Sequence, residues 1–276
     1  MAIRFSKMHG AGNDFVLIDL RHGQAAPDAA LAGAMGNPHT GIGFDQLLSI
    51  ENSDRADCVA RYRIWNSDGS LAQQCGNGAR CVAAWLIRDG AASPPRFRLD
   101  SPAGVIDVDC LDDGRFELDM GRPEFAPAKI PLLMASPSDS YSAQVAGNSI
   151  SFGAASMGNP HALLLVEDVE FAPVEQIGPA LQASGLFPEG VNVGFAQVIS
   201  REEIRLRVYE RGAGETLACG SGACAAVAIL ATQGKVDQQV AVHLPGGRLD
   251  IRWPGANAPI RMAGPAAFVF EGEWLQ

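Results

Sequence analysis

A short pattern occurs twice in this 276-residue chain, each time at the start of a run of small and apolar residues. The first copy begins at Cys75 (CGNGA) and the second, 144 positions later, begins at Cys219 (CGSGA). Residues 61–66 (RYRIWN) match residues 205–210 (RLRVYE) at the same offset. Two long copies are too few for a solenoid, which needs several units of about 20–50 residues, so the repeat predicts two homologous domains.

Weaker matches extend the repeat toward the N-terminus. Gly12-Asn13 resembles Gly158-Asn159 at an offset of 146. Residues 43–46 (GFDQ) resemble residues 194–197 (GFAQ) at an offset of 151. We interpret the drift in the offset as small insertions between matching segments.

The repeat also predicts where the domains end. Residues from Gly264 onward lie past the second copy and should return to the first domain as an added strand. We therefore expect a first domain of residues 1–119 plus 264–276 and a second of residues 120–263. Each is within the usual size of a domain and can bury its own core. Because ligand sites often lie at domain interfaces, we expect the active site between them.

The local pattern within each copy predicts many strands and one buried helix. Short alternating runs bounded by glycine and proline are typical of strands, and they include residues 15–19, 105–109 and 116–120. Residues 222–231 are apolar on every side, and residues 78–88 are nearly so, which predicts helices enclosed by sheet. Gly90 and Gly234 stand where left-handed helix caps are expected. The pattern therefore predicts an α+β fold.

Composition excludes several classes of protein. The net charge of −10 disfavours a nucleic-acid surface, which would carry a basic patch. The N-terminus lacks an apolar signal core, and no apolar run approaches the length of a membrane span, so we expect a cytoplasmic protein without a membrane segment. Six cysteines are too few for a disulfide scaffold of this length, which favours free thiols.

The two repeated cysteines are the candidates for catalysis. A helix start presents unsatisfied N–H groups with partial positive charge, so a cysteine there should titrate below its free pKa of about 8.5. The glycines that follow Cys75 and Cys219 let a carboxylate approach these N–H groups. Two thiols on opposite faces of one carbon could remove a proton from one face and deliver another to the opposite face.

Other roles for the cysteines are weaker. The pairs Cys75/Cys81 and Cys219/Cys224 fall within predicted helices and lack the C-x2-C spacing of a structural zinc site, so no metal site is expected. Four cysteines without the repeated setting are interpreted as small core residues, namely Cys58, Cys81, Cys110 and Cys224.

Several long motifs make the chain resemble diaminopimelate epimerase, a family that interconverts LL- and meso-2,6-diaminopimelate without a cofactor. These motifs are SKMHGAGNDFVLID, GIGFDQLL, WNSDGSLAQQCGNGARC, MGNPHA, NVGFAQV and ERGAGETLACGSGACA. The resemblance implies two pseudo-symmetric domains, each a mainly antiparallel sheet or barrel curled around a central buried helix. It also implies a role in lysine and peptidoglycan precursor synthesis, with no cofactor and no metal.

The resemblance assigns roles to individual residues. Cys75 and Cys219 match the two catalytic thiols, with Cys75 the base toward the LL substrate. His161 and Glu210 match residues that tune the pKa of the thiol pair. The reacting carboxylate would be held by the backbone N–H groups of Gly76, Asn77, Gly220 and Ser221. The remaining substrate-binding positions are Asn13, Gln46, Asn66, Asn159, Asn192, Glu210 and Arg211. Among these, Asn66, Asn192 and Arg211 can hold the distal carboxylate, while Glu210 can accept a hydrogen bond from an ammonium group.

Three alternatives stay open at the sequence level. Proline racemase and hydroxyproline epimerase share the paired-thiol chemistry, and phenazine-biosynthesis isomerases share the fold without the cysteines. A non-catalytic module that binds an amino acid is the third alternative, although binding alone would not require the two thiols. Phe270 stands where some relatives of the family have a tyrosine at a dimer contact, so a homodimer is expected.

Overall fold

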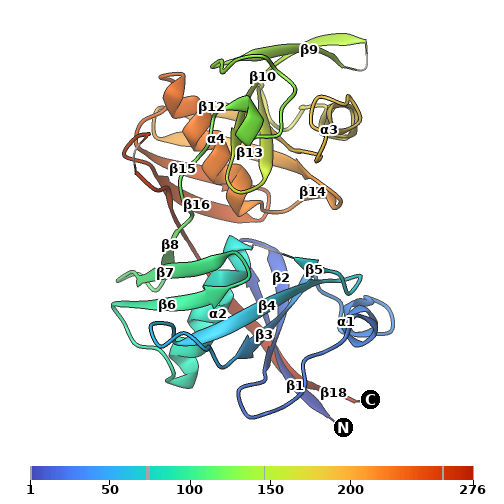
Figure 1. The fold of residues 1–276 in the computed structure, drawn as a ribbon, viewed down its shortest axis with the longest axis vertical. Coiled ribbons are helices and arrows are strands. Elements are labelled where there is room, and N and C mark those ends of the chain that lie inside the picture. Colours follow the sequence, from blue (N-terminus) through green and yellow to red (C-terminus); the bar gives the residue numbers. More distant parts are fainter. Residues whose placement is uncertain (1, 73–74, 146, 257, 276) are drawn as a thin grey trace. The chain divides into compact units, whose positions relative to one another are not determined.

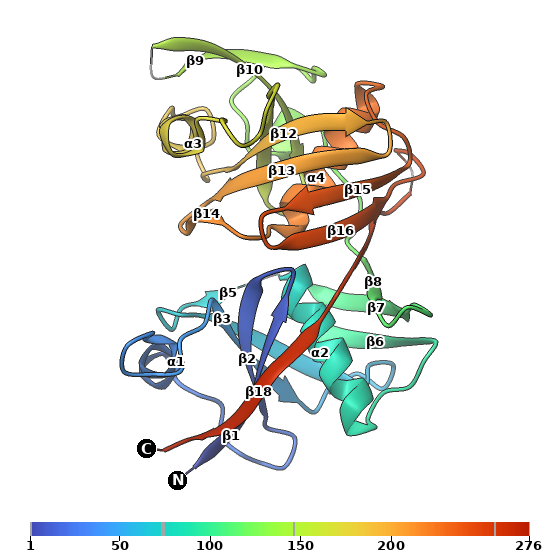
Figure 2. The ribbon, with the colours of Figure 1, turned by 180° about the vertical axis from the view of Figure 1, so that it is seen from behind.

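The computed structural model describes residues 2–72, 75–145, 147–256 and 258–275 and divides into two compact units (Figures 1 and 2). Unit 1 comprises Met1–Asp119 and Ala263–Gln276, and unit 2 comprises Met120–Met262. Among the described residues, no helix combines the length and the apolar character needed to cross a membrane.

The described residues of unit 1 form one mixed sheet and two helices. In chain order it contains β1 (Ile3–Gly10), β2 (Asn13–Asp19), α1 (Ala29–Gly36), β3 (Gln46–Glu51), β4 (Ala60–Asn66), β5 (Leu71–Ala72), α2 (Gly76–Asp89), β6 (Arg96–Ser101), β7 (Gly104–Cys110), β8 (Phe116–Asp119) and β18 (Ala267–Trp274). The strands are ordered β18-β1-β2-β3-β4-β6-β7-β8, and β5 pairs with the end of β4. The β2–β3 and β4–β6 pairs are parallel, and the others are antiparallel.

Unit 2 repeats this arrangement. In chain order it contains η1 (Pro127–Lys129), β9 (Tyr141–Val145), β10 (Asn148–Ser156), β11 (Pro160–Leu165), α3 (Val174–Gln182), β12 (Asn192–Ser200), β13 (Glu203–Glu210), β14 (Gly214–Thr216), α4 (Gly220–Thr232), β15 (Gln239–Leu244) and β16 (Gly247–Arg252). The strand β17 (Arg261–Gly264) crosses the boundary between the units. The order β9-β10-β11-β12-β13-β15-β16 has parallel pairs at β11–β12 and β13–β15, as at the matching places in unit 1.

The predicted α+β class and the internal repeat are therefore confirmed, and strands outnumber helices in both units. The two units differ in the strand that pairs with the outer edge of their first matching hairpin, β1–β2 in unit 1 and β10–β11 in unit 2. In unit 1 it is β18, from the C-terminal end of the chain, whereas in unit 2 it is β9, which directly precedes β10.

Strand register corrects one match within the sequence repeat. Gln46 of β3 pairs with Phe15 of β2 and with Asn66 of β4. Asn192 of β12 pairs with His161 of β11. The next residue, Val193, pairs with Tyr209 of β13, directly before Glu210. Asn192 is thus the structural equivalent of Gln46, at an offset of 146. The match of residues 43–46 with residues 194–197 was wrong because a shared Gly-Phe-x-Gln pattern outweighed the pairing geometry that sequence alone does not reveal.

The two central helices are buried as predicted. Helix α4 packs against β10, β11, β12 and β16, while α2 packs against β1, β2, β3 and β8 (Figure 1). Gly153 of β10 shows how closely they approach, because an added Cβ there would lie 2.3 Å from Ile229 Cγ2 of α4. Gly90 caps α2 in the left-handed conformation, and Gly234, with φ +69°, directly follows the cap of α4. Both predicted stops are confirmed.

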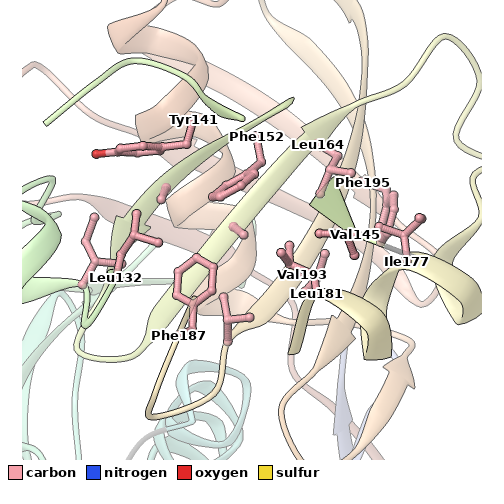
Figure 3. Packing of buried hydrophobic residues seen from close by; sticks show 14 of the residues in the cluster. Leu132, Tyr141, Val145, Phe152, Leu164, Ile177, Leu181, Phe187, Val193 and Phe195 are labelled. Atoms are coloured by element: carbon pink, nitrogen blue, oxygen red, sulfur yellow. The ribbon is translucent and has the colours of Figure 1, made fainter. Parts of the chain in front are cut away.

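Besides the packing around α4, unit 2 has an apolar core that holds the β9–β10 hairpin and α3 against the sheet (Figure 3). The Phe152 ring lies 5.8 Å from Tyr141 and 6.0 Å from Phe187 between ring centroids. Leu181 of α3 and Phe195 of β12 are fully buried in the same cluster. Burying each such side chain stabilises a fold by about 1.5–3 kcal/mol, so this core anchors the strand β12 that leads from Asn192.

Candidate active site

Cys75 is the N-cap residue of α2, as predicted, and its backbone is extended with φ −151°. The N–H of Gly78 donates to Cys75 Sγ at 3.4 Å, which satisfies one of the N–H groups that a helix start leaves open. An added Cβ at Gly78 would lie 3.2 Å from a methyl group of Leu48 and 3.3 Å from the Phe15 ring. A small residue here therefore lets the helix start press against β2 and β3. Gly76 and Asn77 complete the first turn and are buried.

Side-chain amides surround Cys75. Its Sγ lies 3.6 Å from Asn13 Oδ1, and Asn77 Nδ2 donates to the same oxygen at 3.3 Å. On the other side, Asn13 Nδ2 donates to Asp45 Oδ2 at 2.7 Å. Asn13 therefore presents its carbonyl oxygen to the thiol and its amino group to a carboxylate.

Gln46 and Asn66 form a second pair in unit 1. They lie opposite each other on β3 and β4, and Gln46 Nε2 donates to Asn66 Oδ1 at 3.0 Å. Asn66 Nδ2 in turn donates to Ser70 Oγ at 3.0 Å. Gln46 Oε1 is buried with no hydrogen-bond partner in the described part of the chain, so it is an acceptor suited to an ammonium group.

Cys219 is the N-cap residue of α4, at the position in unit 2 that Cys75 has in unit 1. Its side chain is buried, and Sγ donates to Glu210 Oε2 at 3.1 Å. Thr216 Oγ1 donates to the other oxygen of Glu210 at 2.5 Å. The Ser221 hydroxyl lies 3.7 Å from the sulfur, close enough to donate to it.

The expectation of a lowered pKa is wrong for Cys219. Burial raises the pKa of this thiol well above its usual range, and the negative charge of Glu210 raises it further. The hydrogen bond with Ser221 acts in the opposite direction but is the smaller effect. The helix start therefore does not decide the protonation state, because desolvation and a nearby carboxylate outweigh it. Cys219 is held as a thiol that gives its proton toward Glu210.

His161 and Asn159 support the same helix start from the β10–β11 turn. Burial, with a contribution from Arg211, lowers the pKa of His161 to about 3, so its ring is neutral near pH 7. His161 Nε2 and Asn159 Oδ1 are 3.0 Å apart. Since the amide oxygen can only accept, the ring donates from Nε2. Asn159 Nδ2 then donates to Ser221 Oγ at 3.4 Å, which leaves the Ser221 proton to point toward the sulfur.

Arg211 directly follows Glu210 at the end of β13, and Asn192 is the first residue of the neighbouring strand β12. The buried Asn192 side chain donates to the Pro160 carbonyl at 3.1 Å and accepts from the Arg211 N–H at 3.0 Å. It therefore ties the turn after Glu210 to β11. The exposed Arg211 side chain donates to the Glu189 carbonyl at 2.5 Å.

The predicted site residues thus form one set in each unit. Unit 1 holds Asn13, Gln46, Asn66, Cys75, Gly76 and Asn77, whereas unit 2 holds Asn159, His161, Asn192, Glu210, Arg211, Cys219, Gly220 and Ser221. No three His, Cys, Asp or Glu side chains are grouped as metal ligands in the ranges that the structure describes. Some residues that hydrogen-bond to this set were not assigned from sequence. They include Gly78, Asp45, Thr216 and Arg80, whose guanidinium donates to Asn77 Oδ1 at 2.8 Å. Their only signal was that they lie inside the motifs GIGFDQLL, CGNGARC and ERGAGET.

Sequence comparison finds close similarity along nearly the whole chain. The profile of the family described as diaminopimelate epimerase matches residues 5–126 and 153–269. A diaminopimelate epimerase from Xanthomonas campestris pv. campestris is 57% identical over 275 residues, covering 99% of this chain and 97% of that protein. One from Xylella fastidiosa strain M12 is 52% identical over 273 residues, covering 99% of this chain and 96% of that protein.

Solved structures with much lower identity share the fold. A hydroxyproline epimerase from Agrobacterium vitis aligns with a TM-score of 0.71 at 16% identity, covering 99% of this chain and 92% of that chain. A phenazine biosynthesis protein from Bacillus anthracis aligns with a TM-score of 0.70 at 16% identity, covering both chains completely. At this level of identity the likeness shows a common architecture and nothing about the reaction.

Proposed function

Because the chain belongs to the diaminopimelate epimerase family, we propose that it interconverts LL- and meso-2,6-diaminopimelate by exchanging the proton on one α-carbon. The observation that carries the proposal is the setting of the two cysteines. Each caps a buried helix, and each has a neighbour for both of its protonation states. For Cys75 these are the Gly78 N–H and Asn13 Oδ1, and for Cys219 they are the Ser221 hydroxyl and Glu210.

In the proposed mechanism, the Cys75 thiolate removes the α-proton of the LL substrate. The Gly78 N–H stabilises this thiolate beforehand, and Asn13 Oδ1 accepts from the Sγ–H that forms. Cys219 then delivers its own proton to the opposite face of the carbanion and becomes a thiolate, which the Ser221 hydroxyl can stabilise. One proton is taken and one is given, and the roles exchange in the reverse direction.

The helix starts supply the stabilisation of developing charge. The backbone N–H groups of Gly76, Asn77, Gly220 and Ser221 are the donors proposed for the reacting carboxylate. One donor of this kind typically contributes about 10²–10³ in rate. No step of this mechanism requires an electron-withdrawing cofactor, so we expect turnover without pyridoxal phosphate.

Selectivity is proposed to come from the distal amino-acid group of the substrate. Asn66, Asn192 and Arg211 would hold its carboxylate. Glu210 can accept from an ammonium group, as can Gln46 Oε1, which has no hydrogen-bond partner among the described residues. A substrate without this group would leave buried polar atoms unpaired, which penalises it strongly. The proposed reaction feeds lysine and peptidoglycan precursor synthesis, and we propose on this basis that the protein acts in the cytoplasm.

A side-by-side assay tests the proposed reaction against its nearest rival. The protein is kept under reductant, without pyridoxal phosphate, and is given either LL-diaminopimelate or L-proline. We expect the first substrate to be epimerised and the second to be unchanged, and added pyridoxal phosphate should not alter the rate. Racemisation of proline, or dependence on the cofactor, would contradict the proposal.

We also propose that β18 is the contact of a homodimer. Its Phe268, Val269 and Phe270 side chains are 37–56% exposed, and an edge strand with such side chains is suited to a second copy of the chain. Phe270 packs against Phe5 with ring centroids 5.9 Å apart, so it is held in place while half exposed. Phe270→Asp should convert a dimer to a monomer in light scattering, whereas Phe171→Asp, at an 86% exposed site in unit 2, should not. A monomeric wild type would refute this contact.

A further inference from the structure

A hydrogen-bond chain in unit 1 runs from a buried arginine to a carboxylate through the two amides beside Cys75. Arg80 donates to Asn77 Oδ1 at 2.8 Å, and Asn77 Nδ2 donates to Asn13 Oδ1 at 3.3 Å. Asn13 Nδ2 donates to Asp45 Oδ2 at 2.7 Å. A guanidinium can only donate and an ionised carboxylate can only accept, so the two ends fix which way both amides point.

The orientation of these amides decides which atom of Asn13 faces the Cys75 thiol. With both ends in place, Asn13 must turn its oxygen toward Cys75 Sγ, 3.6 Å away. If Asn13 turned over, its amino group would face the sulfur instead. An acceptor stabilises the thiol that Cys75 becomes after removing the substrate proton, whereas a donor would stabilise the thiolate. The orientation of one amide therefore sets how strongly Cys75 holds the proton it has taken.

Arg80 carries a charge in the interior of unit 1. It is completely buried on α2, and burying a charge is strongly unfavourable unless hydrogen bonds compensate for it. Its guanidinium also donates to the Pro265 carbonyl at 3.2 Å, and Gly10 leaves room for it, since an added Cβ would lie 3.3 Å from the guanidinium. The residue at the same place in unit 2 is Cys224, five positions after the capping cysteine. The same helix start therefore forms without an arginine.

We propose that Asp45 and Arg80 are positioning residues that hold the Asn13 oxygen toward Cys75. This inference rests on the proposed function for its catalytic meaning, but the hydrogen-bond chain lies wholly in unit 1 and can be tested through the thiol alone. Neither residue touches the reacting carbon in this account; both act through the amides of Asn13 and Asn77.

The experiment measures how fast iodoacetamide alkylates Cys75 at pH 7, by mass spectrometry of its peptide. Asp45→Asn replaces the acceptor by a group that can also donate, so Asn13 is no longer held in one orientation. Alkylation of Cys75 should become several-fold faster, while kcat for LL-diaminopimelate falls by about tenfold with little change in KM. Asp14→Asn is the matched control. It makes the same charge change beside Asn13, but Asp14 bonds to the backbone of Asp45 and to Lys7 rather than to the Asn13 side chain.

A double variant separates orientation from net charge. Asp45→Asn combined with Arg80→Met removes both ends of the hydrogen-bond chain without changing the net charge. We expect alkylation of Cys75 to stay as fast in this double variant as in Asp45→Asn. If charge alone set the reactivity, Arg80→Met would slow alkylation, Asp45→Asn would speed it and the double variant would match wild type. That pattern would overturn the proposal, as would equal effects of Asp45→Asn and Asp14→Asn.

Two further readouts keep the outcome clear. Cys81 is fully buried on the same helix, so it should stay unmodified unless the helix start has opened. If Arg80→Met does not fold, the comparison of Asp45→Asn with Asp14→Asn decides the matter. If wild type shows no epimerisation but Cys75 responds as described, the proposed function fails and the positioning role stands. The reverse result would remove the positioning role alone.

Discussion

The cysteine sites of the two units share a backbone and differ in polarity. Both sulfurs cap a buried helix that follows the same order of strands. In unit 1, the hydrogen-bond chain from Arg80 to Asp45 includes Asn13, whose acceptor oxygen faces the sulfur. In unit 2, the chain from His161 through Asn159 ends in the Ser221 hydroxyl, which can donate, while Glu210 accepts the thiol proton. A duplicated scaffold thus carries two thiols that hold their protons in different ways.

Strand register and helix position identify the substitutions that create this difference. The equivalent residues, with unit 1 first, are Phe15 and His161, Gln46 and Asn192, Asn66 and Glu210, Asn77 and Ser221, and Arg80 and Cys224. The backbone pairings are unchanged at these places. The chemistry of each site therefore resides in a few side chains, which makes the units controls for each other.

The largest effect should come from removing either sulfur. Cys75→Ala and Cys219→Ala should each lower epimerisation by about 10²–10⁴ or more, because each removes one of two obligatory proton carriers. Cys81→Ala and Cys224→Ala, which change buried cysteines inside the same two helices, should keep most of the activity. Turnover and circular dichroism are measured for all four variants. A folded Cys75 or Cys219 variant with near-normal turnover would exclude that sulfur from the reaction.

Replacing the carboxylate of unit 2 by an amide should make its thiol resemble that of unit 1. Glu210→Gln removes a negative charge that raises the pKa of Cys219, so that pKa should fall and alkylation of Cys219 near pH 7 should accelerate. Turnover should fall by about a hundredfold, since proton transfer loses its matched acceptor. Glu215→Gln, a similar charge change on β14 at a residue paired with Arg207, is the control. Slower alkylation of Cys219 in Glu210→Gln would contradict this account.

Replacing His161 by phenylalanine, the residue at the equivalent position of unit 1, should weaken the dependence of folding stability on pH. The native pKa of about 3 lies below the ordinary 6.5, so between these values the unfolded chain binds a proton that the native chain does not. Stability due to this residue is therefore complete above pH 6.5 and is lost as the pH falls toward 3. Between pH 7 and pH 5 wild type should lose about 2 kcal/mol more than His161→Phe, as measured by urea unfolding. Parallel losses in the two proteins would show that His161 is not neutral in the native state.

The smallest effect concerns the helix ends, where the units are alike. Gly90 and Gly234 both have positive φ, and an added Cβ would meet no atom within 4 Å at either place. Alanine should therefore cost about 1 kcal/mol at each position, from backbone strain alone. Equal shifts in urea unfolding would support equivalent caps. A markedly larger loss at one glycine would reveal a difference between the units that the backbone does not show.

Local signals in the sequence were enough for much of the fold. The repeated cysteines, the following glycines and the terminal Gly90 and Gly234 act within a few residues, so helix starts and stops could be predicted correctly. The α+β class followed from alternating runs around two apolar helices. The match of residues 43–46 with 194–197 failed, because pairing between β3 and β4 decides register and a four-residue pattern does not.

The protonation states could not be predicted from sequence. The helix start favours a thiolate at Cys219, but burial and Glu210 outweigh it, and both depend on tertiary packing. Asp45 and Arg80 escaped assignment for the same reason. Asp45 is 32 positions from Asn13, and Arg80 is three positions from Asn77. Only folding brings the four residues into one hydrogen-bond chain.

In the proposed reaction, one thiol takes a proton and the other gives one. This mechanism is tested most directly by following the first few per cent of conversion of LL-diaminopimelate in D₂O by mass spectrometry and NMR. The meso product should carry deuterium at one α-carbon, because the Cys219 thiol that supplies its new hydrogen exchanges with D₂O. The remaining LL substrate should stay unlabelled. Meso product that retains the original protium would show a single base acting on both faces and would exclude the two-thiol mechanism.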